Sequence, residues 1–156
     1  MLSKYPEDGL THYNRGLTNY YVKNYIASIA DYDACVKYKP DCAPCYFNRG
    51  LSFKELGDMA AVLRDMDLAL QYKPAYTDAF RNRGNAKAMM KDYPGSIADF
   101  TTALTYTPQD TNVLLNRGLS YFFSQDLSKA CLDWRSAAAH GSRKGSSLVK
   151  DNCPAP

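Results

Sequence analysis

The sequence predicts an all-α fold made of four copies of a two-helix repeat, and three regular series of residues indicate it. The tripeptide Asn-Arg-Gly stands at 14–16, 48–50, 82–84 and 116–118, so each copy begins 34 residues after the one before. Prolines follow the same step at positions 40, 74 and 108, with Pro6 one step earlier, and aspartates follow it at positions 31, 65, 99 and 133. Self-similarity at a period of this length is typical of stacked repeat architectures.

Each copy contains two segments with apolar residues at helical spacing. In the first copy these segments are 10–22, which includes Tyr13 and Leu17, and 25–38, which includes Ile29. A polar dipeptide separates them, and its second residue is Asn24, Asp58, Asp92 or Asp126. Such a side chain can cap the second helix by accepting a hydrogen bond from a free backbone N–H. The recurrent proline predicts the end of the second helix, because it has no N–H and disfavours helix in the residue before it.

A glycine falls in the middle of every first helix, at Gly16, Gly50, Gly84 and Gly118. Glycine in a helix interior costs about 0.8–1 kcal/mol relative to alanine. A cost repeated four times needs a structural reason, and close approach of the paired helix is the natural one.

These features resemble the tetratricopeptide repeat (TPR). Besides the glycine and the proline, the resemblance rests on a large and a small residue, three apart, in each second helix. The large residues are Tyr32, Met66, Phe100 and Trp134, and the small ones are Cys35, Ala69, Ala103 and Ala137. The resemblance divides the chain into repeats 9–42, 43–76, 77–110 and 111–144 within a single domain, 1–156. It implies a right-handed α-solenoid, closed by a C-terminal capping helix at about 143–151 that follows Ser142, where the last repeat lacks its proline.

Composition and motifs exclude several classes of function. With 46% hydrophobic and 22% charged residues the chain is not a disordered segment. Its net charge of +3 includes no basic run longer than Arg143-Lys144, which argues against nucleic-acid binding. No apolar run approaches the ~18–20 residues of a membrane span. Motifs for phosphate binding, zinc proteolysis and a nucleophile elbow are absent from the sequence. We expect neither an enzyme nor a cofactor or metal ion.

Each repeat pairs an arginine with an aspartate 16 residues later. The arginines are Arg15, Arg49, Arg83 and Arg117, at a place where the TPR family usually has leucine. The pairing predicts a bidentate ion pair that joins the first helix to the second, or to the first helix of the next repeat. The alternative is a set of solvated charges that contribute little.

First helices line the inner face of TPR arrays, so the resemblance also implies which residues face a partner. These are Tyr13, Leu17, Tyr20 and Tyr21 of the first repeat; Phe47, Leu51 and Lys54 of the second; Arg81, Asn85 and Met89 of the third; and Leu115, Leu119, Phe122 and Phe123 of the fourth. An exposed patch this apolar usually marks a partner site. The alternative is that these side chains pack against each other, the capping helix or a second copy of the chain.

A polar series accompanies that face, formed by Asn14, Asn48, Asn82 and Asn116. A carboxamide has both a donor and an acceptor and can satisfy a peptide backbone. In some TPR proteins a similar series binds the main chain of the ligand. The alternative is a hydrogen bond within the helix or to the neighbouring repeat.

The chaperone-binding class of TPR proteins grips a C-terminal carboxylate with lysines and asparagines. Where that class begins its clamp, this chain has Tyr13 and Leu17, and only Arg81, Asn85 and Asn116 match it in type. We therefore expect no clamp of that kind. We expect instead a scaffold that binds a peptide or helix of a partner protein in a concave groove. Two other interpretations stay open: a module that self-assembles through the groove or its end caps, and a thiol redox or metal-binding protein that uses Cys42 and Cys45.

Five cysteines occur, at 35, 42, 45, 131 and 153, and an odd count leaves at least one unpaired or linked between chains. Cys35, Cys42 and Cys45 give three metal ligands where zinc needs four, so a structural bridge or a plain loop is favoured. Cys131 and Cys153 could form a bridge that pins the capping helix. The segment from Ala130 onward also resembles the C-terminal end of TPR proteins from bacterial cell envelopes. With the cysteine usage, it favours an oxidising compartment such as the periplasm.

Overall fold

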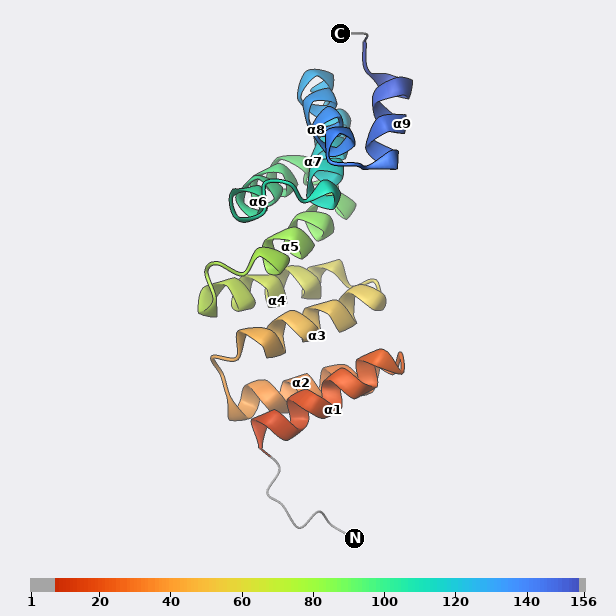
Figure 1. Ribbon diagram of the computed structural model, residues 1–156. Coiled ribbons are helices and arrows are strands. Elements are labelled where there is room, and N and C mark those ends of the chain that lie inside the picture. The colour runs from red at the N-terminus through yellow and green to blue at the C-terminus, as the bar shows by residue number, and fades with distance from the viewer. Residues whose placement is uncertain (1–7, 155–156) are drawn as a thin grey trace. The chain divides into compact units, whose positions relative to one another are not determined.

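Nine helices and no strand make up residues 8–154, the part of the chain that the computed structural model describes (Figure 1). In order they are α1 (Gly9–Tyr21), α2 (Tyr25–Tyr38), α3 (Ala43–Glu55), α4 (Met59–Tyr72), α5 (Thr77–Met89), α6 (Tyr93–Tyr106), α7 (Thr111–Phe123), α8 (Leu127–Ala139) and α9 (Arg143–Asn152). The all-α prediction is confirmed. Pro6, which extends the proline series, lies outside the described residues.

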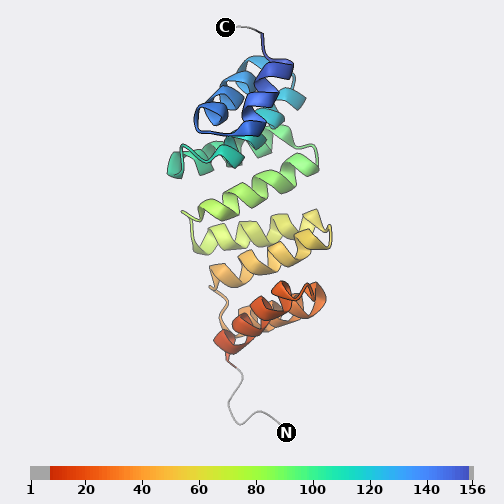
Figure 2. The same ribbon diagram turned by 45° about the vertical axis from the view of Figure 1, so that its right-hand side comes forward.

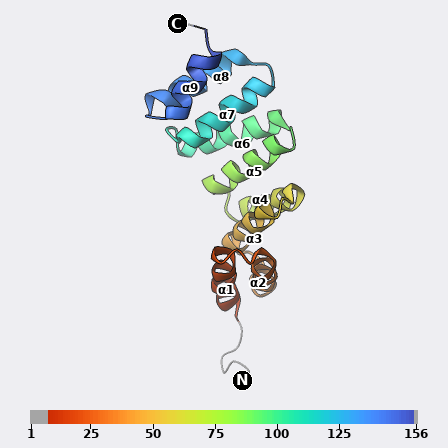
Figure 3. The same cartoon turned by 90° about the vertical axis from the view of Figure 1, so that its right-hand side faces the viewer.

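The chain divides into two compact units, residues 1–79 and 80–156, and each is described by itself. In unit 1 the hairpins α1/α2 and α3/α4 pack on each other through α2 and α3 (Figure 2). In unit 2 the packing runs from α6 to α7, α7 to α8 and α8 to α9 (Figure 3). Organisation as one domain over 1–156 stays a prediction.

The helix boundaries follow the polar residues and prolines of the sequence. Asn24, Asp58, Asp92 and Asp126 cap the second helices as expected; Asp58, for example, accepts a hydrogen bond from the Ala61 N–H at 2.9 Å. The residue before each cap adopts the left-handed backbone conformation, with φ of 61° at Lys23 and 81° at Gly57. Each second helix that precedes a recurrent proline ends two residues before it, as α2 does at Tyr38 before Pro40.

Close contact between the two helices of a hairpin explains the recurrent glycines. The large residue that faces each of them is fully buried: Tyr32, Met66, Phe100 and Trp134. A Cβ added to Gly84 would lie 2.9 Å from Cε1 of Phe100, and one added to Gly16 would lie 2.8 Å from Cε1 of Tyr32. The expected close approach is confirmed, because any larger residue would push the ring away.

Small polar side chains join one repeat to the next within each unit. The hydroxyl oxygens of Ser28 and Ser52 lie 3.0 Å apart between α2 and α3, and those of Ser96 and Ser120 lie 2.8 Å apart between α6 and α7. All four residues are buried. A buried hydroxyl needs a partner, so each pair fixes how two helices meet as well as filling space.

The C-terminal helix α9 covers the end of unit 2. Ser142 caps it by accepting from the Gly145 N–H at 3.1 Å, and Leu148 and Val149 pack against the buried cluster around Trp134. Gly145 lies so close to α8 that a Cβ there would be 2.9 Å from the Ala138 nitrogen. A disulfide joins Cys131 of α8 to Cys153 just beyond α9, which is the bridge that the sequence suggested.

Candidate partner-binding surface

Arginine–aspartate pairs hold the first helix of each hairpin in a fixed rotation. Arg49 donates to Asp65 through Nε at 2.9 Å and through Nη2 at 2.6 Å. Arg83 contacts Asp99, and Arg117 contacts Asp133, in the same two-bonded way. The ion-pair prediction is confirmed, with the partner on the second helix of the same repeat. Residues two positions before or after the arginine point roughly the opposite way around the helix.

Electrostatics within these pairs favour the charged state of the arginines. Burial works against the charged guanidinium of Arg49, but the hydrogen bonds and the negative charge of Asp65 outweigh burial and raise the pKa of Arg49. Hydrogen bonding to Asp133 likewise raises the pKa of Arg117 despite burial. Arg49 also donates to Asp33 of α2 at 2.6 Å, and Arg117 to Thr101 of α6 at 3.1 Å. These arginines therefore connect three helices.

The first repeat departs from this pattern. Asp31 receives Arg15 on a single oxygen, with Nε at 2.7 Å from Oδ1, while its other oxygen accepts from Asn19 Nδ2 at 2.8 Å. The Arg15 side chain is 53% exposed, against 16–19% for Arg49, Arg83 and Arg117. The residue type at the place of Asn19 varies, with Phe53, Lys87 and Tyr121 in the later repeats, so the repeat pattern did not predict this contact. Lys87 makes an equivalent one, with Nζ 2.8 Å from Asp99 Oδ2.

In unit 1 the candidate face is rich in tyrosine. Tyr13, Leu17 and Tyr20 are partly exposed, and Tyr21 at the end of α1 is 78% exposed. Tyr20 packs against Tyr25 of α2, with ring centres 5.6 Å apart. Burial and the nearby charge of Glu55 raise the pKa of Tyr20, so its hydroxyl stays a neutral donor.

The α3 side of this face is also partly exposed. Phe47 and Leu51 both retain contact with solvent, as does Lys54. The ring centres of Phe47 and Tyr76 lie 4.7 Å apart. The Lys73 ammonium also lies over the Tyr76 ring, 4.2 Å from its centre. Unit 1 thus presents aromatic rings from two first helices.

In unit 2 the exposed aromatic residues of the candidate face lie at the end of α7; Tyr106 at the end of α6 is also exposed but belongs to a second helix. Phe123 is 58% exposed and stacks on Tyr93 of α6, with ring centres 5.5 Å apart. The ring centres of Phe122 and Trp134 lie 5.7 Å apart. Met89 is exposed and Leu119 is partly exposed. Met90, which is exposed, and Tyr93 also belong to this surface, although the repeat pattern did not point to them. Their place beside the α5–α6 turn and next to Met89 was the available signal.

Two residues expected on the face are buried instead. Leu115 is 6% exposed and belongs to the core of unit 2, where its carbonyl accepts a hydrogen bond from Trp134 Nε1 at 3.4 Å. Asn82 is 7% exposed. These side chains can support a binding face, but their own surface is largely covered. Arg81 is half-buried, with Nη1 at 3.5 Å from Asp110 Oδ2.

The asparagine series makes hydrogen bonds within the chain. Asn48 donates to the Pro44 carbonyl at 2.9 Å and to the Tyr13 hydroxyl at 3.2 Å. Asn116 donates to Asn85 Oδ1 at 2.9 Å. For these two amide groups, the alternative of hydrogen bonds within the helix or to the neighbouring repeat is therefore confirmed. Asn14 is exposed on α1.

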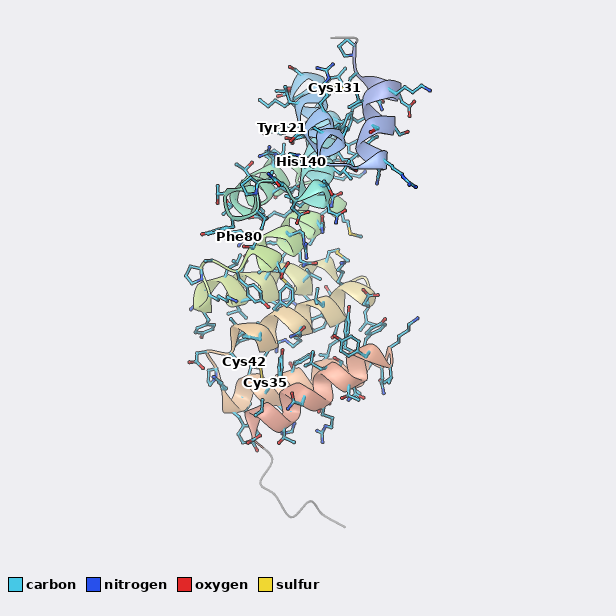
Figure 4. All side chains as sticks on the ribbon, viewed as in Figure 1. Cys35, Cys42, Phe80, Tyr121, Cys131 and His140 are labelled. Carbon is cyan, nitrogen blue, oxygen red and sulfur yellow. A yellow bond between two sulfur atoms is a disulfide. The ribbon has the colours of Figure 1, made fainter. Side chains whose placement is uncertain are left out.

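Three cysteines meet where α2 leads into α3, close to the labelled Cys35 and Cys42 of Figure 4. The sulfur atoms of Cys35, Cys42 and Cys45 all lie within 4.8 Å of one another. Beside them is a cavity of about 370 Å³, lined also by Leu10, Tyr13, Lys39 and Pro44. The spacing of these cysteines in the sequence groups them, but it does not predict the cavity, which depends on how α1 packs.

No protein-family model and no curated protein matches this sequence. Solved structures do match its fold. A MamA structure from Desulfovibrio magneticus is similar over 95% of this chain and 88% of its own, with a TM-score of 0.86 and 15% identity. The first TPR of Spaghetti (RPAP3), bound to an HSP90 peptide, is similar over 78% of this chain and 94% of its own, with a TM-score of 0.71 and 21% identity. The Arabidopsis OM64 TPR domain is similar over 72% of this chain and 93% of its own, with a TM-score of 0.70 and 23% identity.

These likenesses establish that the chain has the tetratricopeptide-repeat fold, as the spacing of its glycines and prolines indicated. At these identities the likeness concerns the fold alone. Within residues 8–154, every helix is too short or too polar to cross a membrane.

Proposed function

We propose that this chain is a non-catalytic scaffold that binds a peptide or helical segment of a partner protein through the first helices of its repeats. The observation that carries the proposal is the exposure of aromatic side chains at the ends of α1 and α7, above all Tyr21 and Phe123. Exposed aromatic residues are costly on a surface without a partner, and they are the side chains that most often anchor protein interfaces.

Polar groups beside these rings suit a peptide ligand. The side-chain amide oxygens (Oδ1) of Asn48 and Asn116 accept no hydrogen bond from any described residue, so they are available to a backbone N–H. The RPAP3 domain, whose fold is similar, was solved with an HSP90 peptide. Because this chain has Tyr13 and Leu17 where a carboxylate clamp would begin, we expect its ligand to be apolar rather than an acidic C-terminus.

The experiment compares face variants with matched controls in the full chain. Tyr21→Glu and Phe123→Glu place a charge on the proposed face, whereas Ile26→Glu and Leu132→Glu place one on second helices at residues 68% and 62% exposed. Partners that co-purify with the wild-type chain are identified and their affinity measured. We expect each face variant to weaken binding about tenfold or more, and the controls to leave it unchanged. Unchanged binding by both face variants would refute the proposal.

Self-assembly is the second candidate, because the same exposed rings could be covered by another copy of the chain. Light scattering over a range of concentrations separates the two. A stable dimer that dissociates in Phe123→Glu, with no other partner recovered, would favour self-assembly. The Cys131–Cys153 bridge supports a further part of the proposal, that the protein works in an oxidising compartment such as the periplasm or cell envelope.

A further inference from the structure

One sulfur in unit 1 is shared between two possible bridges. Cys45 has disulfide geometry with Cys35 and also with Cys42, at Cα–Cα separations of 6.4 and 5.3 Å. Both separations lie in the usual disulfide range. A sulfur atom forms only one S–S bond, so Cys45 can be bonded to one partner at a time. The other partner is then a thiol next to a disulfide.

The repeat fold does not require these sulfurs. The other repeats have Ala69, Ala103 and Ala137 in place of Cys35, and Thr11, Ala79 and Val113 in place of Cys45. Cys42 caps α3 where Asp8 caps α1 and Asp110 caps α7. Cysteine therefore occurs at these three repeat positions only at the α2–α3 junction, where Cys35, Cys42 and Cys45 come together. The coincidence points to chemistry rather than to helix packing.

The three cysteines differ in access and environment. All three line the cavity, but Cys35 and Cys45 are fully buried, whereas Cys42 is partly exposed. The sulfur of Cys42 accepts a hydrogen bond from the Cys45 N–H at 3.2 Å, at the N-terminus of α3. That position stabilises a thiolate, which is the reactive form of cysteine. An incoming reagent therefore meets Cys42 first.

We propose that Cys35, Cys42 and Cys45 form a thiol–disulfide exchange site for low-molecular-weight disulfides of the glutathione type, an activity separate from partner binding. A cavity of about 370 Å³ has the size of a small-molecule site, and Lys39 on its wall can pair with a carboxylate of the reagent. Cys42 is the attacking residue, Cys45 resolves the mixed disulfide, and Cys35 takes over the bridge.

The exchange balances in three steps. The Cys42 thiolate attacks one sulfur of the disulfide, so Cys42 becomes linked to one half and the other half leaves as a thiolate. Cys45 then attacks the Cys42 sulfur, which releases the second half and forms Cys42–Cys45. Finally Cys35 attacks Cys45, which forms the buried Cys35–Cys45 bridge and returns Cys42 as a thiolate. Two electrons pass from two cysteine thiols to the reagent, and their protons go to the two thiolates released.

The test treats the fully reduced, full-length protein with glutathione disulfide, traps the products with an alkylating agent and maps them by mass spectrometry. Wild type should retain no glutathione and should show Cys45 linked partly to Cys35 and partly to Cys42. The double variant Cys35→Ala with Cys45→Ala, which leaves no neighbouring thiol to resolve the mixed disulfide, should retain one glutathione, on Cys42. Cys35→Ala should give only Cys42–Cys45, and Cys42→Asp should react at least tenfold more slowly at the remaining pair.

These substitutions copy residues from other repeats, so circular dichroism should show an unchanged helical content, and Cys131 and Cys153 serve as an internal control for bridge formation. The proposal is overturned if Cys131–Cys153 forms while the other three cysteines stay reduced. It is also overturned if the double variant Cys35→Ala with Cys45→Ala carries no adduct or if Cys42→Asp reacts as fast as wild type. Protection of the three thiols by one bound zinc or copper(I) ion per chain would assign the cluster to a metal instead.

Discussion

Each recurrent glycine lies against the large side chain of its paired helix, yet the four sites differ in how they could yield to a larger residue. At Gly84 the neighbour is the edge of the Phe100 ring, with three ring carbons within 3.2 Å of an added Cβ. At Gly50 the nearest atom is the terminal methyl of Met66, at 2.5 Å. A ring moves only as a whole, whereas a methionine methyl can turn aside.

We therefore expect Gly84→Ala to lower the free energy of unfolding by about 1–3 kcal/mol, even though alanine favours helix. Gly50→Ala should cost less than about 1 kcal/mol. Urea unfolding of the two variants beside wild type measures both. Equal effects at the two sites would contradict this account of the packing.

Tyr32 pairs a buried ring with an unsatisfied hydroxyl. Its oxygen has no hydrogen-bond partner among the described side chains and backbone, and the third repeat has Phe100 at the same position. Burial raises the pKa of Tyr32 above its usual value. The folded state therefore resists ionisation that the unfolded chain allows, and wild-type stability should fall as the pH rises above about 10.

Tyr32→Phe removes both penalties. At neutral pH we expect the variant to be more stable by about 1–3 kcal/mol, and the advantage over wild type should grow above pH 10. Thermal or urea unfolding from pH 7 to 11 measures the difference. A variant less stable than wild type at neutral pH would mean that the hydroxyl has a partner.

At the scale of helices, the arginine–aspartate pairs decide how the two members of a hairpin are rotated. Removing one member leaves a buried charge alone, whereas replacing both by apolar residues does not. The fourth repeat is the clearest case, because the side chains of Arg117 and Asp133 are 19% and 8% exposed. The first repeat is the natural comparison, since Asp31 also receives Asn19 and Arg15 is half exposed.

Arg117→Leu should destabilise the protein by about 3 kcal/mol, and the double variant Arg117→Leu with Asp133→Ala should recover most of that loss. Arg15→Leu should cost clearly less, because the remaining aspartate keeps a donor. Urea midpoints of the three variants provide the measurement. A double variant as unstable as the single one would show that the pair stabilises the fold beyond offsetting the cost of burying its two charges.

At the scale of the whole molecule, the helical hairpins depend on the repeat pattern and not on sulfur. Repeats with no cysteine at the α2–α3 positions form the same helices, and the bridge at the C-terminus attaches only α9. A bridge that closes 22 residues stabilises that attachment by about 3 kcal/mol.

Reduction should therefore leave the far-ultraviolet circular dichroism nearly unchanged while α9 loosens. Hydrogen exchange followed by mass spectrometry should show faster exchange in residues 143–153 of the reduced protein, with α7 and α8 still protected. Cys153→Ser should behave in the same way without reductant. General loss of protection on reduction would show that the bridges hold the repeats themselves.

The sequence alone predicted the repeat length, the helix ends and the glycine contacts, because each depends on residues at a fixed spacing within one hairpin. It also singled out the Arg–Asp series, but the structure was needed to show that each pair lies within one hairpin. Which side chains reach solvent depends instead on how the helices pack against one another. Leu115 is buried and Met90 is exposed, although the resemblance to TPR arrays implies that the former is part of the face and is silent on the latter. Likewise, three cysteines from the end of one helix and the start of the next share one cavity because α1, α2 and α3 pack together there. Exposure and convergence depend on contacts between distant segments, and no local spacing encodes them.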